Sequence, residues 1–240
     1  MNYKKIYCSN APAVLVSCKS FEESAERGIV IFYHGLGASK ESNFTELEGI
    51  ASVGFLAVGI DNVGHGERRE SNFENLFSEN NIDRVKNIYR YVKETAEEVE
   101  EIISFLMSKF SLKNPKISVC GISMGGCIAY LTPQYSNKIN VVSSILGTPI
   151  WHNVGDNFQD RIILYKNVAL LSQNGALDDI ICASDVQRFH SILNETYHSA
   201  NHKFVKYDWS GHFMREEDWY TACSLSVDWI KNHLNLKTTY

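Results

Sequence analysis

The sequence feature that most limits the possible folds is a series of short apolar runs separated by longer stretches with helical periodicity. Several runs are apolar on consecutive residues, as in "GIVIFYHG" (28–35) and "KISVCGIS" (116–123). This pattern is typical of strands in a parallel sheet whose two faces are both covered by helices. Together the runs predict seven strands, at 13–18, 28–35, 54–61, 116–123, 141–148, 168–175 and 203–208.

The stretches between the runs predict helices. The clearest one covers about residues 83–108, where apolar side chains recur three or four positions apart. Strands that alternate with helices require right-handed crossovers, which predicts an α/β fold with a doubly wound parallel sheet. Because no low-complexity linker or internal repeat interrupts the 240 residues, we expect a single domain over 1–240.

Composition and charge argue against several classes of partner. The chain has 44% hydrophobic and 21% charged residues, as folded proteins do. A formal charge of −5 argues against a nucleic-acid or membrane partner, which would require a basic patch. The six cysteines form no CxxC pair, and "MNYKKIYCSN" lacks the apolar core of a signal peptide. We therefore expect reduced thiols, no metal site and a cytoplasmic protein. The sequence leaves the oligomeric state open.

The stretch "GISMGG" (121–126) lies between a predicted strand and a predicted helix at about 124–134. Ligands of open α/β sheets bind at the carboxyl ends of the strands. Residues 121–125 have the G-x-S-x-G pattern of a nucleophile elbow, a strained turn from which the serine hydroxyl projects. The alternative is a plain glycine-rich turn with a capping serine. The strand before it and the helix after it favour Ser123 as a nucleophile.

A serine nucleophile requires a base, and the base requires a carboxylate that orients it. On this type of sheet the order along the chain is serine, then acid, then histidine. Among the histidines after Ser123, His212 lies in a glycine-marked loop, "DWSGHFM", that follows the last predicted strand. His190 and His198 fall inside a predicted helix, where a packed or solvated histidine is usual. We predict that His212 is the base.

The acid is expected in "LLSQNGALDDIICASD", just after the predicted strand 168–175. Asp178 and Asp179 are both placed there, and only one of them can point at the histidine. Asp178 is preferred, and Asp179 remains the alternative.

Two backbone amides are candidates for stabilising a developing oxyanion. The Met124 N–H directly follows the nucleophile and lies at the positive end of the next helix. The Leu36 N–H follows the strand that ends with "YHG" in "YHGLGASKE". His34 in the same motif is expected to be a structural hydrogen-bonding residue.

The motifs "HGLG", "GIDNVGHGERR", "GISMGG", "GALDDI" and "SGH" occur in the order and spacing of the α/β-hydrolase fold. Over roughly residues 12–235 the chain resembles small bacterial esterases of the dienelactone hydrolase and prolyl-oligopeptidase-like branch. The resemblance implies a mostly parallel sheet of about eight strands with helices on both faces. It also implies a catalytic triad and an oxyanion hole, formed by Ser123, Asp178 and His212 and by Leu36 and Met124. Dienelactone hydrolases proper have a cysteine where this chain has Ser123.

Lids of this fold usually lie between the strands that here end near 148 and begin near 166. The segment of about 149–165 is too short to cover a long acyl chain, so we expect an open pocket for a small or short-chain ester. Trp151 and Phe158 are candidates for its apolar wall. No cofactor is expected. The alternatives are a thioesterase, an aminopeptidase-type acyl hydrolase or a non-catalytic ligand-binding homologue.

Overall fold

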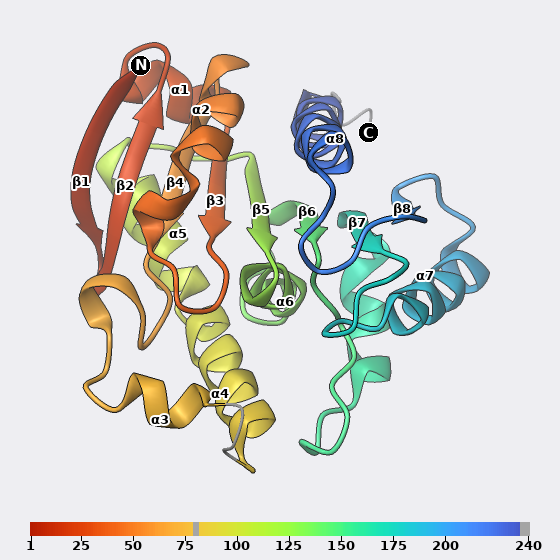
Figure 1. The fold of residues 1–240 in the computed structure, drawn as a ribbon. Helices are drawn as coiled ribbons and strands as arrows, with labels where there is room; N and C mark the ends of the chain where they lie inside the picture. The colour runs from red at the N-terminus through yellow and green to blue at the C-terminus, as the bar shows by residue number, and fades with distance from the viewer. Residues whose placement is uncertain (79–81, 236–240) are drawn as a thin grey trace.

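The structure of the protein is a computed structural model that describes residues 1–78 and 82–235. Its centre is one eight-stranded sheet with the strand order β1-β2-β4-β3-β5-β6-β7-β8 (Figure 1). β1 and β2 pair antiparallel, β2 pairs antiparallel with β4, and the other neighbours are parallel. The strands are β1 Asn2–Cys8, β2 Ala11–Ser17, β3 Ile29–Tyr33, β4 Leu56–Ile60, β5 Ile117–Ile122, β6 Ile139–Ile145, β7 Ala169–Gly175 and β8 His202–Tyr207.

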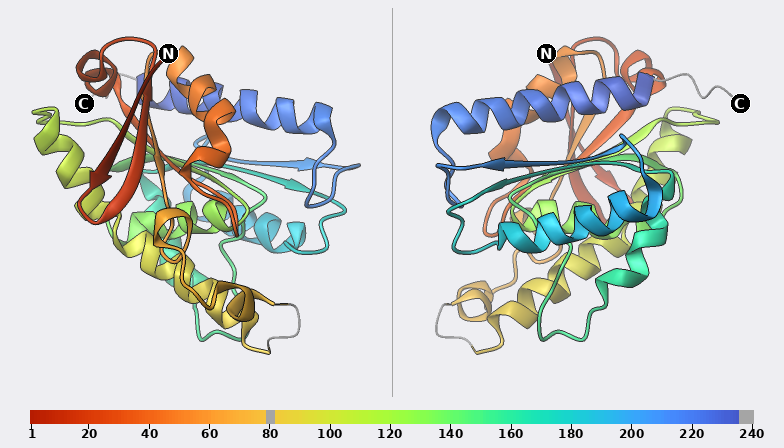
Figure 2. Two further views of the ribbon diagram at one scale, coloured as in Figure 1. Left: turned by 60° about the vertical axis from the view of Figure 1, so that its left-hand side comes forward. Right: turned by 90° about the vertical axis from the view of Figure 1, so that its right-hand side faces the viewer.

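Helices cover both faces of this sheet (Figure 2). The α-helices are α1 Phe21–Arg27, α2 Phe44–Ser52, α3 Phe73–Phe77, α4 Arg84–Glu97, α5 Val99–Lys109, α6 Met124–Leu131, α7 Ala183–Tyr197 and α8 Glu216–Asn235. Short 3₁₀ helices are η1 Lys40–Asn43, η2 Gly66–Arg68, η3 Thr132–Gln134 and η4 Phe158–Lys166. α2 and α8 pack on one face, α5, α6 and α7 on the other, and α4 lies against α6. The predicted mostly parallel, doubly wound sheet is confirmed.

The seven predicted strands are all present, and the sequence analysis missed only β1 among the strands that the structure describes. β1 is an edge strand, and its first residues are exposed while every residue of β2 is buried. An exposed edge strand carries no apolar run, so "NYKKIYC" gave no signal of the kind used for the others.

The predicted helix 83–108 is two helices, α4 and α5, which meet at Glu98. Three residues before this point, the Thr95 hydroxyl donates to the Tyr91 carbonyl at 2.7 Å and accepts the Val63 N–H at 3.0 Å. Such a side-chain bond to the preceding turn bends a helix. The apolar spacing continues through the break, so periodicity alone did not reveal it.

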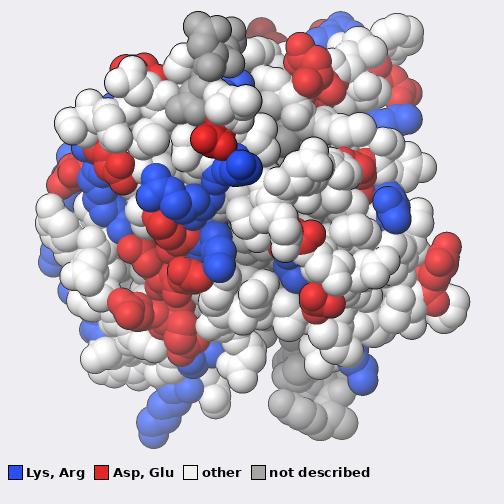
Figure 3. All heavy atoms as spheres, turned by 90° about the horizontal axis from the view of Figure 1, so that it is seen from below, with Lys and Arg blue, Asp and Glu red and all other residues white. Residues whose placement is uncertain are grey.

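One face of the molecule, seen from the side of α3 and α4, carries acidic and basic side chains gathered in a strip along α4 (Figure 3). Much of the remaining surface in this view is uncharged. Among the described helices, none is long and apolar enough to cross a membrane.

Candidate active site

Ser123 occupies the turn between β5 and α6, at the carboxyl end of the sheet. Its backbone has φ 54° and ψ −116°, a conformation that a residue with a side chain rarely adopts. Such strain costs about 1–3 kcal/mol and persists only where the surroundings enforce it. The Ser123 N–H donates to the Ile145 carbonyl at 2.8 Å, which ties this turn to the neighbouring strand β6. The geometry is that of the predicted elbow.

The glycines on either side of Ser123 are required by close backbone contacts. A Cβ on Gly121 would lie 2.2 Å from the Gly125 carbonyl oxygen. A Cβ on Gly125 would lie 2.0 Å from the carbonyl oxygen of Tyr33 on the adjacent strand β3. Both separations are far inside van der Waals contact, so the turn accommodates only glycine at these two positions.

A chain of hydrogen bonds joins the three predicted triad residues, which lie after β5, β7 and β8. The distance from Ser123 Oγ to His212 Nε2 is 2.8 Å, and that from His212 Nδ1 to Asp178 Oδ2 is 2.9 Å. Because an ionised carboxylate only accepts hydrogen bonds, His212 donates from Nδ1 and its Nε2 accepts the Ser123 hydroxyl. The histidine therefore has the tautomer and position that a base requires.

Asp178, rather than its neighbour Asp179, bonds to the histidine. Its side chain has no exposed surface, and its second oxygen accepts the N–H groups of Ile180 and Ile181 at 2.9 Å and 2.8 Å. Burial alone would raise the pKa of Asp178, but the hydrogen bonds from His212 and the two amides outweigh it and lower the pKa. Asp179 is exposed and lines the adjacent cavity.

The two predicted oxyanion donors lie beside Ser123. Met124 is the first residue of α6, where backbone N–H groups have no partner within the helix. The turn after β3 approaches from the other side, since a Cβ built on Gly35 would lie 3.8 Å from the Ser123 Cβ. Leu36 follows Gly35 and lines the same cavity as Ser123. Oxyanion binding by these two amides remains a prediction.

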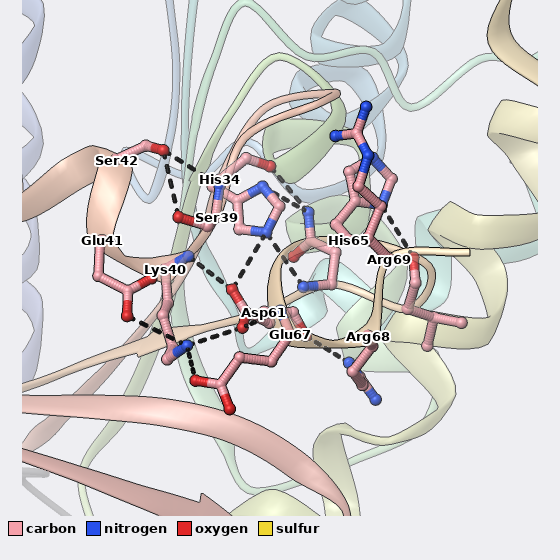
Figure 4. Close-up of polar contacts among 12 residues, drawn as sticks. His34, Ser39, Lys40, Glu41, Ser42, Asp61, His65, Glu67, Arg68 and Arg69 are labelled. Atoms are coloured by element: carbon pink, nitrogen blue, oxygen red, sulfur yellow. Dashed lines mark hydrogen bonds and ion pairs between the residues drawn. The ribbon is translucent and has the colours of Figure 1, made fainter. Parts of the chain in front are cut away.

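The turn that carries Leu36 is held by residues at the end of β4 (Figure 4). The Asn62 backbone N–H donates to His34 Nε2 at 3.1 Å, and the Asn62 side chain donates to the His34 carbonyl at 2.9 Å. His34 is buried, and burial lowers its pKa to about 4, so the ring is neutral near pH 7. These contacts match the structural role expected for His34.

An ion cluster around the buried Lys40 supports the later part of this turn, and the sequence analysis did not identify it. Lys40 Nζ lies 2.8 Å from Asp61 and 2.6 Å from Glu67, and the Lys40 N–H donates to Asp61 at 2.7 Å (Figure 4). Burial would lower the pKa of Lys40, but hydrogen bonds to Asp61, Glu67 and Glu41 outweigh it and raise the pKa. A charged residue five positions after "HG" was the only available signal.

Cys127 lies one helical turn after Ser123 and does not compete with it as a nucleophile. The residue is almost fully buried, and burial raises the pKa of its thiol to about 12. Since only the thiolate attacks, this cysteine is inert near pH 7. Among the described residues no group of three or more His, Cys, Asp or Glu side chains is arranged to hold a metal ion.

A cavity of about 1160 Å³ opens above Ser123 and His212. Its apolar lining comes from the start of α4, from the segment after β6, and from the loops after β7 and β8. It includes Ile82, Val85, Ile88, Trp151, Ile180 and Phe213. The first turn of α4 was predicted only as a core helix, so its part in the cavity wall is a finding of the structure.

Trp151 lines the cavity as predicted, and its ring lies 5.2 Å from that of Tyr89. Phe158 is a correction, since it is not among the described residues that line the cavity. It starts η4, which turns away, so its ring packs 6.2 Å from Phe189 with the Arg188 guanidinium on it.

The segment 149–165 is fixed at two points. The Tyr89 hydroxyl donates to Asp156 at 2.9 Å, and Asp156 also pairs with the buried Arg161 at 2.6 Å. Near the other end of the segment, His152 lies 2.7 Å from Asp185 at the start of α7. The short segment is therefore a braced part of the wall, tied to α4 and α7.

Comparisons with known proteins agree with this geometry. The sequence pattern of the family described as Serine aminopeptidase, S33 matches residues 24–151, more than half of the chain. No curated protein sequence matches the chain.

Solved structures resemble the chain over nearly its whole length. Protein TT1662 of Thermus thermophilus has a TM-score of 0.80 at 18% identity, with 98% of this chain and 99% of that chain covered. A dienelactone hydrolase of Anabaena variabilis has a TM-score of 0.67 at 18% identity and 98% coverage of both chains. An esterase of Pyrococcus furiosus has a TM-score of 0.72 at 13% identity, with 98% of this chain and 92% of that chain covered. These likenesses confirm the α/β-hydrolase fold.

Proposed function

The chain belongs to the family described as Serine aminopeptidase, S33 and is a hydrolase of the α/β-hydrolase type, and we propose that it cleaves carboxylic esters through an acyl-enzyme intermediate. The observation that carries the proposal is the hydrogen-bonded series Ser123, His212, Asp178 at a strained elbow. A serine hydroxyl attacks a carbonyl only when a base accepts its proton, and this series supplies a base and the carboxylate that orients it.

In the proposed reaction, His212 Nε2 takes the proton of Ser123 as the hydroxyl oxygen attacks the ester carbonyl. The Leu36 and Met124 N–H groups hold the oxyanion that forms. His212 then protonates the leaving alcohol, which leaves an acyl group on Ser123. Water, deprotonated by His212, attacks the acyl-enzyme and releases the acid. Asp178 stays ionised throughout and stabilises the protonated ring, in agreement with its lowered pKa.

The size of the ester is a separate part of the proposal. The short segment 149–165 favoured a small or short-chain ester. The cavity volume of about 1160 Å³ exceeds the range of about 300–1,000 Å³ that is typical of small-molecule pockets, so it sets no limit at short chains. We therefore propose that small esters are accepted and that an acyl group of medium length is accepted too.

Amide hydrolysis at a peptide N-terminus is the second candidate. The family description names an aminopeptidase. Asp179 places a carboxylate in the cavity lining that pairs with no described cation, where an amino group would find a counter-charge. Turnover of aminoacyl 4-nitroanilides at rates above those of 4-nitrophenyl esters would favour this candidate.

The test is the initial rate on 4-nitrophenyl acetate, butyrate and octanoate, measured with wild type and with Ser123→Ala. The proposal expects turnover by wild type and a loss of about 10⁴-fold or more in the variant. Equal rates for the two proteins would overturn the assignment of Ser123. Rates that stay high through octanoate would support the argument from cavity volume.

A further inference from the structure

The first turn of α4 carries a cation that has no partner among the described residues. The other three cationic residues of this helix each pair with a nearby carboxylate: Lys86 with Asp83, Arg90 with Glu94 and Lys93 with Glu97. Arg84 forms neither an ion pair nor a side-chain hydrogen bond with any residue that the structure describes. Arg84 is thus the exception within its helix.

Arg84 is also partly removed from solvent. The residue is half-buried, and its Nε has no exposed surface and no hydrogen-bond partner. Buried donors without an acceptor are rare in folded proteins, and each calls for a reason. The side chain lines the cavity that also contains Ser123 and His212. Because Nε is enclosed, a molecule in this cavity can reach the terminal nitrogens of the guanidinium, which form no hydrogen bond with a described residue either.

The remaining charged groups of the cavity show that its walls differ in the sign of their unpaired charge. Lys86 is well exposed and already paired, and Asp185 is paired with His152. Asp179 contributes an exposed carboxylate from the loop after β7. The unpaired positive charge thus belongs to α4 and the unpaired negative charge to the β7 loop. An anionic group is attracted to the wall formed by α4 and repelled by the wall formed by the loop after β7.

We propose that Arg84 binds a carboxylate of the substrate, so that the preferred esters carry one negative charge away from the reacting carbonyl. A guanidinium presents its N–H groups in a planar fork that matches a carboxylate in two parallel hydrogen bonds. One unpaired cation balances a monoanion, whereas a phosphate dianion would keep an excess charge in the cavity. This inference rests on the proposed ester hydrolysis and names the substrate class of that site.

The test compares matched neutral and anionic esters in wild type, Arg84→Gln and Lys86→Gln. One pair is 4-nitrophenyl hexanoate and the mono-4-nitrophenyl ester of adipic acid, which carries a carboxylate in place of the terminal methyl. The other pair is 4-acetoxybenzamide and 4-acetoxybenzoate, with the charge on the leaving group. The quantity compared is the ratio of kcat/KM for the anionic ester to kcat/KM for its neutral partner.

We expect Arg84→Gln to lower this ratio about tenfold to a hundredfold for at least one pair, mainly through KM, because a charge-assisted hydrogen bond is lost. The neutral ester serves as the check that the variant is folded and active. Arg84→Lys should recover part of the ratio, and Lys86→Gln should change it less than about threefold because that lysine is exposed. Equal ratios in wild type and Arg84→Gln for both pairs would overturn the anion site and leave ester hydrolysis standing.

A binding measurement keeps the two proposals separate if wild type cleaves no ester. Calorimetry with monomethyl adipate would use Ser123→Ala and the double variant Ser123→Ala/Arg84→Gln. Binding that weakens about tenfold or more in the double variant supports the anion site independently of turnover. The same affinity in both proteins would contradict it.

Discussion

The floor and the wall of the cavity differ in how their polar side chains are held. On the floor, Ser123 bonds to His212, and the buried Asp178 behind them bonds to His212 and accepts two amide hydrogens. On the wall, Arg84 and Asp179 line the same cavity without forming an ion pair with a described residue. The floor is complete before any substrate binds, whereas the wall has binding capacity left over. We therefore expect the floor to carry the chemistry and the wall to set the selectivity.

The strongest test of this difference between floor and wall uses two neighbouring carboxylates, of which one is bonded to His212 and the other lines the wall. Asp178→Asn should lower kcat about 10⁴-fold because an amide neither holds the correct histidine tautomer nor stabilises the charged ring. Asp179→Asn should change kcat on a neutral ester less than about threefold, since its carboxylate lies outside the hydrogen-bonded series. Similar losses in both variants would remove the distinction between floor and wall.

The rigidity of the floor predicts a large effect on stability from one methyl group. Gly125→Ala would place a Cβ 2.0 Å from the Tyr33 carbonyl oxygen, so we expect about 3 kcal/mol of destabilisation together with loss of activity. Gly49→Ala is the matched control, because a Cβ there meets nothing within 4 Å and alanine favours the helix by about 0.5–1 kcal/mol. Urea unfolding of both variants measures the difference. A Gly125→Ala protein as stable as wild type would contradict the argued close packing.

The stability of the fold should depend on pH through His34, which holds the turn beside the floor. Burial lowers the folded-state pKa of this ring from 6.5 to about 4. Between these values the unfolded chain binds more protons, so acidification destabilises the fold, by about 2 kcal/mol from about pH 8 to about pH 5 for this one group. The free energy of unfolding of His34→Gln should fall less steeply over this range than that of wild type. The two slopes should differ by the uptake of up to about one proton on unfolding. Other buried histidines shift the same way in both proteins, so the comparison isolates His34. Parallel pH profiles would show that His34 is not the group responsible.

A change to the wall should have the smallest effect and act on selectivity. Trp151→Ala removes an aromatic surface from the cavity, so kcat/KM on an octanoate ester should fall about tenfold, mainly through KM. Acetate, which is too short to use that surface, should be affected about twofold or less. Phe158→Leu is the control, since Phe158 packs on Phe189. Equal losses on both esters would place Trp151 in the support of the catalytic residues instead.

The sequence predicted the floor far better than the wall, for a physical reason. The G-x-S-x-G turn, the loop after β7 and the "SGH" loop are short, and their residue types are dictated by backbone geometry. Local pattern therefore identified Ser123 and His212, which the structure joins by a hydrogen bond, and it favoured Asp178 over Asp179 as the partner of the histidine. Which of the two points inward depends on amides of Ile180 and Ile181, a detail of side-chain direction that spacing does not contain.

The wall depends on contacts between distant segments, which no local pattern carries. Arg84 lies at the start of a helix whose apolar spacing indicated only core packing, yet its first turn lines the cavity. Phe158 has the composition of a wall residue, but the 3₁₀ helix η4 directs it to α7. The buried Lys40 and Asp61 pair was missed for the same reason, since the two residues meet only when β3 and β4 are adjacent.

The most direct test of the central claim is the mass of the protein after rapid mixing with a 4-nitrophenyl ester and acid quenching, followed by peptide mapping. We predict an acyl adduct on the peptide that contains Ser123, a burst of nitrophenolate equal to the enzyme concentration, and neither in Ser123→Ala. The exposed cysteines Cys18 and Cys182 would be replaced by serine beforehand, because Cys182 lines the cavity and a blocking group there would interfere with the reaction. Steady turnover with no adduct on Ser123, or an adduct that persists in Ser123→Ala, would contradict the account.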